Sequence, residues 1–124
     1  MVRTIERASL VAKLASPTPP RLAEALPAKY YRDWHLPGAV HLPLDELESR
    51  SASVLPDTEV EIVVYCASVT CHNSDAAARR LGLLGYRNVA VYRGGKQDWR
   101  DAGLPVERDA RGVALERLSV TRPA

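Results

Sequence analysis

Two apolar runs, each followed by a segment with helical periodicity, constrain the fold of this chain most. Val60–Cys66 is rich in β-branched residues and predicts a buried strand, and Ser74–Leu84 repeats apolar residues with the period of a helix. Asn88–Tyr92 and Gly95–Ala102 repeat the same order of strand and helix. Strands that alternate with helices of this length indicate an α/β fold with a central, mostly parallel sheet and helices on both of its faces.

The rest of the chain predicts shorter elements, and its 124 residues suit one domain. We expect this domain to span residues 1–109 and the polar, weakly patterned residues 110–124 to form a C-terminal tail. The expected elements before the first long strand are a helix or a strand plus helix at Ile5–Leu14, a strand at Arg21–Leu26, a helical turn at Ala28–Trp34, a strand at Ala39–Leu42 and an amphipathic helix at Leu44–Ser51.

The composition excludes several classes of function. A net charge of +2 is too small to indicate nucleic acid or an anionic membrane surface as a partner. No apolar run approaches the roughly 20 residues of a membrane-spanning helix, and the first residues lack the apolar core of a signal peptide. We therefore expect a cytoplasmic monomer or homodimer with two reduced cysteines.

Cys66 ends the predicted strand just before the helix that starts near Ser74. A tight turn at this place directs backbone N–H groups and the positive end of a helix dipole toward the thiol, and both would favour the nucleophilic thiolate. An inert, buried cysteine is the alternative. Ligands bind at the carboxyl ends of the strands in such sheets, which favours a reactive thiol on a central strand.

Three segments in order resemble the rhodanese (sulfurtransferase) family. His35–Pro43 resembles the family's His-Ile-Pro-Gly-Ala segment, Val63–Cys66 ends where the family has its catalytic cysteine, and Val91–Trp99 resembles its Gly-Gly-x-x-x-Trp close. The resemblance covers about residues 5–107 and implies a single-domain protein with a rhodanese-like fold. It also implies sulfur transfer that needs no cofactor and no metal.

The resemblance further implies that Cys66 carries a persulfide. Its thiolate would take a sulfane sulfur from thiosulfate or a persulfide donor and pass it to a thiol or to cyanide. Arg93 and Lys96 lie in the turn after the last strand and could contact an anionic donor. The loop expected to hold the persulfide consists of Ala67, Ser68, Val69, Thr70, Cys71, His72 and Asn73.

Two other functions stay open. Related folds include thiol phosphatases, whose Cys-x₅-Arg loop clamps an oxyanion, but the sixth residue after Cys66 is His72. Family loops also place about five residues between the cysteine and the helix-opening serine, whereas seven separate Cys66 from Ser74 here. An arsenate reductase or phosphatase is thus less favoured than a non-catalytic interaction or sulfur-carrier module.

The roles of the neighbouring residues also stay open at this point. Cys71 could resolve a persulfide or pair with Cys66, or it could be a loop cysteine without a partner. His72 could contact the donor or be solvated. Zinc at Cys66, Cys71 and His72 is disfavoured because the set lacks a fourth ligand. We expect His35 and Trp99 to be structural residues.

Overall fold

A computed structural model describes residues 2–108, which form a five-stranded, fully parallel sheet in the order β1-β5-β4-β2-β3. The central strand is β4, whose carboxyl end leads to Cys66. The elements are β1 (Arg3–Ile5), α1 (Arg7–Leu14), β2 (Arg21–Glu24), α2 (Ala28–Asp33), β3 (Val40–His41), the 3₁₀ helix η1 (Leu44–Glu46), α3 (Leu47–Val54), β4 (Ile62–Tyr65), α4 (Asn73–Leu83), β5 (Val89–Tyr92) and α5 (Gly95–Asp101).

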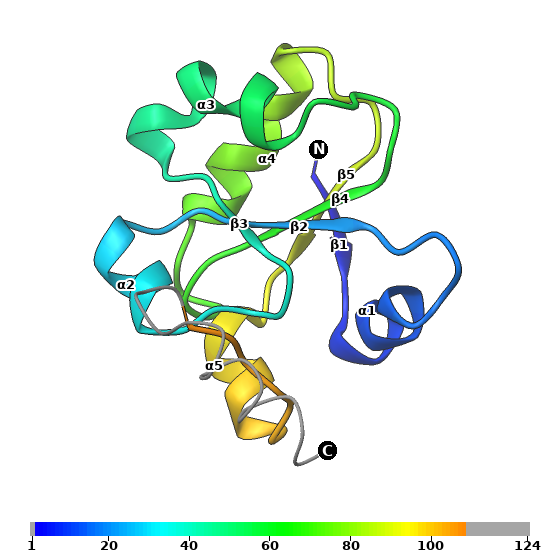
Figure 1. The fold of residues 1–124 in the computed structure, drawn as a ribbon, viewed down its shortest axis with the longest axis vertical. Coiled ribbons are helices and arrows are strands. Elements are labelled where there is room, and N and C mark those ends of the chain that lie inside the picture. Colours follow the sequence, from blue (N-terminus) through cyan, green and yellow to red (C-terminus); the bar gives the residue numbers. More distant parts are fainter. Residues whose placement is uncertain (1, 109–124) are drawn as a thin grey trace.

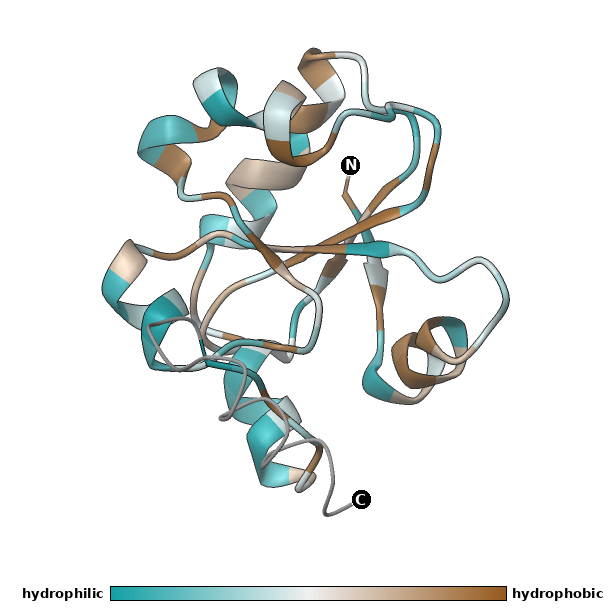
Figure 2. Ribbon diagram, in the orientation of Figure 1, coloured by the Kyte–Doolittle hydropathy of each residue, from teal (hydrophilic) through white to brown (hydrophobic). Residues whose placement is uncertain are grey.

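The side chains of β4 show why the sheet is covered on both faces. All of them are buried, and they alternate between two core clusters. Ile62 and Val64 pack into the cluster beneath α3 and α4, while Val63 and Tyr65 pack into the cluster beneath α1 and α5. Figure 1 shows these two helix pairs on opposite sides of the sheet, and Figure 2 shows apolar residues concentrated along the central strands.

The fold confirms the α/β expectation, with small shifts at the ends of elements. The N-terminal segment forms a strand followed by a helix, and the helix expected at Leu44–Ser51 divides into η1 and α3 and extends to Val54. Gly85, with a φ of 103°, follows the end of α4, and Gly103, with a φ of 72°, follows the end of α5. The predicted tail, residues 110–124, lies outside the described residues.

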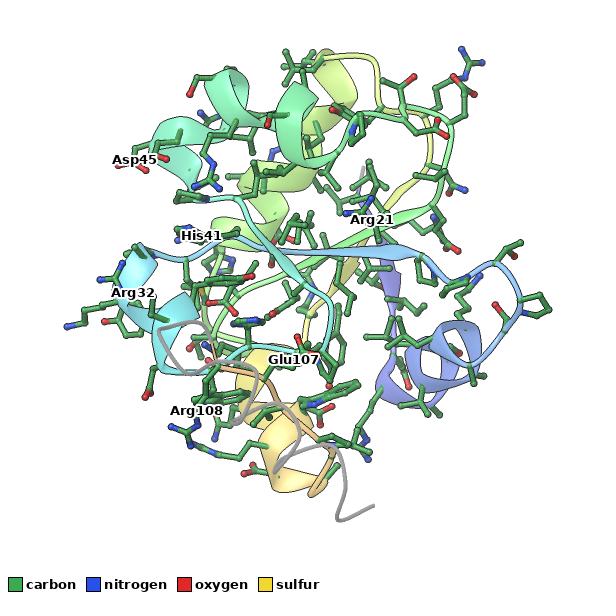
Figure 3. The ribbon with its side chains drawn as sticks, viewed as in Figure 1. Arg21, Arg32, His41, Asp45, Glu107 and Arg108 are labelled. Atoms are coloured by element: carbon green, nitrogen blue, oxygen red, sulfur yellow. The ribbon has the colours of Figure 1, made fainter. Side chains whose placement is uncertain are left out.

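The end of the described chain returns to the turn that follows α2. Glu107 and His35 exchange two backbone hydrogen bonds of 2.8 and 2.9 Å, and the Glu107 carboxylate accepts a hydrogen bond from the N–H of Gly38 at 3.0 Å. Figure 3 labels Glu107 at this position. His35 is buried, and its Nδ1 lies 2.8 Å from the carbonyl of Tyr31, which confirms a structural role. Between residues 2 and 108, no helix has the length and apolar character needed to cross a membrane.

Candidate active site

The thiol of Cys66 lies at the carboxyl end of the central strand, inside the loop that leads to α4. Cys66 is only 2% exposed. The sulfur lies 3.4 Å from the carbonyl oxygen of Cys71 and 3.4 Å from the hydroxyl oxygen of Ser74. The loop therefore folds back over the sulfur atom, and α4 contributes a hydroxyl from its first turn.

The prediction that this turn lowers the pKa of Cys66 is wrong for the resting structure. Burial raises the pKa of the Cys66 thiol and the side chain of Cys71 raises it further, whereas the Ser74 hydroxyl lowers it. The free energy that is needed to remove a thiolate from water exceeds the stabilisation that the nearby dipoles give to it. The resting form is therefore the neutral thiol, which has to lose its proton before it can attack.

The backbone of the loop supplies hydrogen-bond donors. A turn is closed by the N–H of Cys71, which donates to the carbonyl of Ser68 at 3.0 Å. In the part of the chain that the structure describes, the N–H groups of residues 67–70 donate to no backbone carbonyl. These groups are therefore available to an anion bound at the end of β4.

The start of α5 determines how the loop is oriented. The N–H of Lys96 donates to the carbonyl of Cys66 and that of Gln97 to the carbonyl of Ala67, both at 2.9 Å. Because a trans peptide places its N–H opposite its C=O, the N–H groups of Ala67 and Ser68 point away from α5. The contact with α5 thus fixes the direction of two of the loop's donors.

Gly95 permits this close contact. It has a φ of +65°, and a Cβ atom there would lie 2.4 Å from the carbonyl oxygen of Cys66. An L-residue is disfavoured in this conformation even without the overlap. Gly94 and Gly95 thus form a tight turn beside the cysteine loop.

A buried acid–base pair lies under the loop. The ammonium of Lys96 donates to the Glu24 carboxylate at 3.2 Å and to the carbonyl of Tyr30 at 2.8 Å, and it lies 4.5 Å from the centre of the Trp34 ring. The Tyr65 hydroxyl donates to the other carboxylate oxygen at 2.9 Å. This network connects β2, β4 and α5, and it adjoins the cysteine loop because the N–H of Lys96 donates to the carbonyl of Cys66.

Burial dominates the ionisation of this pair. It raises the pKa of Glu24 and lowers the pKa of Lys96, and the attraction between the two groups opposes both shifts. The charge of Lys96 is offset by a carboxylate in direct contact. An anionic donor that contacted Lys96, as predicted, would therefore also lie close to the negative charge of Glu24.

Arg93 and His72 meet at Asp75 on the first turn of α4. The Arg93 guanidinium donates to the Asp75 carboxylate at 2.8 Å, and Nδ1 of His72 lies 3.6 Å from the same oxygen. Hydrogen bonding to Arg93 lowers the pKa of the Asp75 carboxyl. Arg93, the second predicted anion contact, is thus also paired with an acid.

A pocket of about 260 Å³ opens beside the loop. Ala67 and Ser68 of the cysteine loop form one part of its wall. Trp34, together with Lys96 and Arg100 of α5, forms another part. The pocket is large enough for a small anion or the end of a thiol compound. It places such a ligand next to the loop that holds Cys66.

Sequence reasoning found the cysteine and its loop but missed the residues that support them. Glu24, Tyr65 and Ser74 are all buried and polar contacts link each of them to the site. One signal was available for Glu24, since a single acid in the apolar run Leu22–Leu26 is costly to bury without a partner. The partner itself, Lys96, lies 72 residues away.

Comparisons with known proteins agree with the fold. The sequence profile of the Rhodanese-like domain family matches residues 7–102, and the chain belongs to this family. It is 36% identical over 89 residues to an HTH-type transcriptional regulator of Mycobacterium tuberculosis, and the match covers 72% of this chain and 38% of the regulator.

Two sulfurtransferases are also similar. The chain is 34% identical over 59 residues to the thiosulfate sulfurtransferase PspE of Escherichia coli, covering 48% of this chain and 55% of that protein. A crystal structure of a thiosulfate sulfurtransferase from Pseudomonas aeruginosa superposes with a TM-score of 0.69 and 29% identity, covering 88% of this chain and 20% of the other. The chain thus spans 38% of the length of the regulator and 55% of the length of PspE.

Proposed function

We propose that this protein is a sulfurtransferase that carries a sulfane sulfur as a persulfide on Cys66. The observation that carries the proposal is the position of this thiol at the carboxyl end of the central strand, under a loop with available N–H donors. The similarity to thiosulfate sulfurtransferases of two bacteria supports the same chemistry.

The first step loads the cysteine. After Cys66 loses its proton, its thiolate attacks the outer sulfur of thiosulfate, the S–S bond of the donor breaks, and sulfite leaves with the bonding electrons. A persulfide donor would react in the same way and release a thiolate. The N–H groups of the loop would stabilise the negative charge on the new outer sulfur.

The second step unloads it. A thiolate or cyanide attacks the outer sulfur, and the Cys66 thiolate leaves. Because the charges of Lys96 and Arg93 are offset by Glu24 and Asp75, we assign most of the attraction for the donor to the backbone N–H groups of the loop. A reducing compartment such as the cytoplasm would keep both thiols available.

Loading of Cys66 tests the proposal directly. Cys71→Ser is incubated with thiosulfate, and released sulfite and the intact mass are measured without reductant. We expect one sulfite per chain and a gain of about 32 Da, the mass of one sulfur atom. Cys66→Ser should show neither change. If Cys71→Ser gains no sulfur from thiosulfate or from a persulfide donor, sulfur transfer through Cys66 is refuted.

A further inference from the structure

The second cysteine of the loop lies against the first. The turn from Ser68 to Cys71, closed by a hydrogen bond of 3.0 Å, brings Cys71 back over the end of β4. The thiol of Cys66 then lies 3.4 Å from the carbonyl oxygen of Cys71. Both cysteines are free thiols.

Cys71 also affects the ionisation of Cys66. After burial, Cys71 is the next cause that raises the pKa of the Cys66 thiol. The Cys66 sulfur lies 3.4 Å from the main chain of Cys71, and two cysteines held this close on one short loop can form a disulfide without a large movement of the backbone.

The cysteines differ in their access to solvent. Cys66 is buried, whereas Cys71 is partly exposed. A bulky thiol acceptor therefore meets Cys71 and the loop before it can reach Cys66. Within the described residues, Cys71 is the thiol that is already in place to react with a sulfur bound at Cys66.

We propose that Cys71 is a resolving cysteine, whose thiolate attacks the Sγ atom of persulfidated Cys66, forms a Cys66–Cys71 disulfide and releases hydrosulfide. This inference rests on the proposed function, because it begins from the Cys66 persulfide. It extends that function from transfer of sulfur to its release as sulfide.

The step balances without an outside oxidant. The bond between the two sulfur atoms of Cys71 and Cys66 forms, and the bond between Sγ of Cys66 and its outer sulfur breaks. The outer sulfur leaves with the electron pair and a proton as HS⁻, so it is reduced while the two cysteines are oxidised. A dithiol reductant then returns the disulfide to two thiols for the next cycle.

The contact also favours attack on the inner sulfur. The turn places the Cys71 carbonyl oxygen 3.4 Å from Sγ of Cys66, whereas the outer sulfur of a persulfide lies about 2 Å further along the S–S bond. Attack on the outer sulfur would instead move the persulfide to Cys71 and release no sulfide. The two routes have different products and are easily told apart.

The test compares three proteins under anaerobic conditions, with thiosulfate and no added thiol. They are the unmodified protein, Cys71→Ser, and the double variant Cys71→Ser/Ala52→Cys, which restores the number of thiols on the exposed side of α3. Sulfite, sulfide and intact mass are measured for each. Sulfite reports the loading of Cys66, and sulfide reports the resolving step.

We expect the unmodified protein to release one sulfite and one sulfide per chain and to end about 2 Da lighter, as a disulfide that has lost two hydrogens. Both variants should release sulfite but no sulfide and should keep the added sulfur. Sulfite without sulfide from the unmodified protein, including transfer of the persulfide to Cys71, would overturn the resolving step and leave the proposed function standing. If no protein releases sulfite and none gains sulfur from a persulfide donor, the proposed function fails and the resolving step fails with it.

Discussion

Replacing Gly95 with alanine should both destabilise the fold and displace the cysteine loop. The residue has a φ of +65°, and an added Cβ would lie 2.4 Å from the Cys66 carbonyl oxygen and 3.0 Å from backbone atoms of Ala67 and Ser68. All three neighbours are backbone atoms, so the overlap cannot be relieved by rotating a side chain. The loop or α5 has to move by about 1 Å to restore ordinary contact distances.

Gly103→Ala is the matched control. Gly103 has a similar φ of +72°, but nothing lies within 4 Å of an added Cβ. It therefore carries only the conformational cost of an L-residue in the left-handed region, about 1–2 kcal/mol. Gly95→Ala carries the same cost and the overlap, and we expect a total loss of about 3–4 kcal/mol in the free energy of unfolding.

Urea denaturation and the rate of sulfite release measure the two effects. A displacement of about 1 Å at a reacting group can slow a reaction about 10²-fold, so Gly95→Ala should load Cys66 about a hundred times more slowly. Gly103→Ala should load at the rate of the unmodified protein. Equal losses of stability in the two variants, together with normal loading by Gly95→Ala, would refute the argument that Gly95 holds the loop in place.

Three further changes test the supporting residues. Gly82→Ala in the last turn of α4 meets nothing within 4 Å, so it should raise the free energy of unfolding by about 0.4–1 kcal/mol in a urea titration; a loss of stability would contradict the open surroundings. Lys96→Met leaves Glu24 buried without its partner and should cost about 3 kcal/mol near neutral pH. Because the pKa of Glu24 in the folded protein is above its unfolded value, this loss of stability should shrink as the pH falls toward that unfolded value and Glu24 binds a proton. The loss should also be smaller in Lys96→Met/Glu24→Gln. A loss that is the same at every pH would exclude the unpaired carboxylate as its cause. Since the Ser74 hydroxyl lowers the pKa of Cys66, Ser74→Ala should move the pH–rate curve of sulfite release to higher pH, whereas an unchanged midpoint would remove Ser74 from the ionisation of the thiol.

Much of the site was readable from the sequence because its signals are local. Cys66 follows a β-branched run, and the residues after it lack helical periodicity until α4 begins at Asn73, one residue before the expected start. The double glycine at Gly94 and Gly95 indicates a turn that few other residues adopt. Each of these inferences needs only neighbours within a few positions of the chain.

The ionisation of the site could not be read in this way. The turn and the helix start near Cys66 predicted a lowered pKa, but burial by distant segments outweighs both and raises it. Lys96 was considered as a possible contact for an anionic donor, and in the fold it is buried against Glu24 of β2. A sequence gives the type of each charged group but not the groups packed around it.

The sequence by itself determined the alternation of strands and helices, the place of Cys66 at the end of a strand and the glycine turn beside it, because period and backbone preference are properties of short segments. Only the tertiary structure decided the order of the five strands in the sheet, that Glu24 and Lys96 are partners, and that Cys71 folds back onto the Cys66 thiol. These features depend on which distant segments exclude water from one another. The desolvation that results, rather than the local turn, sets the resting charge of the thiol.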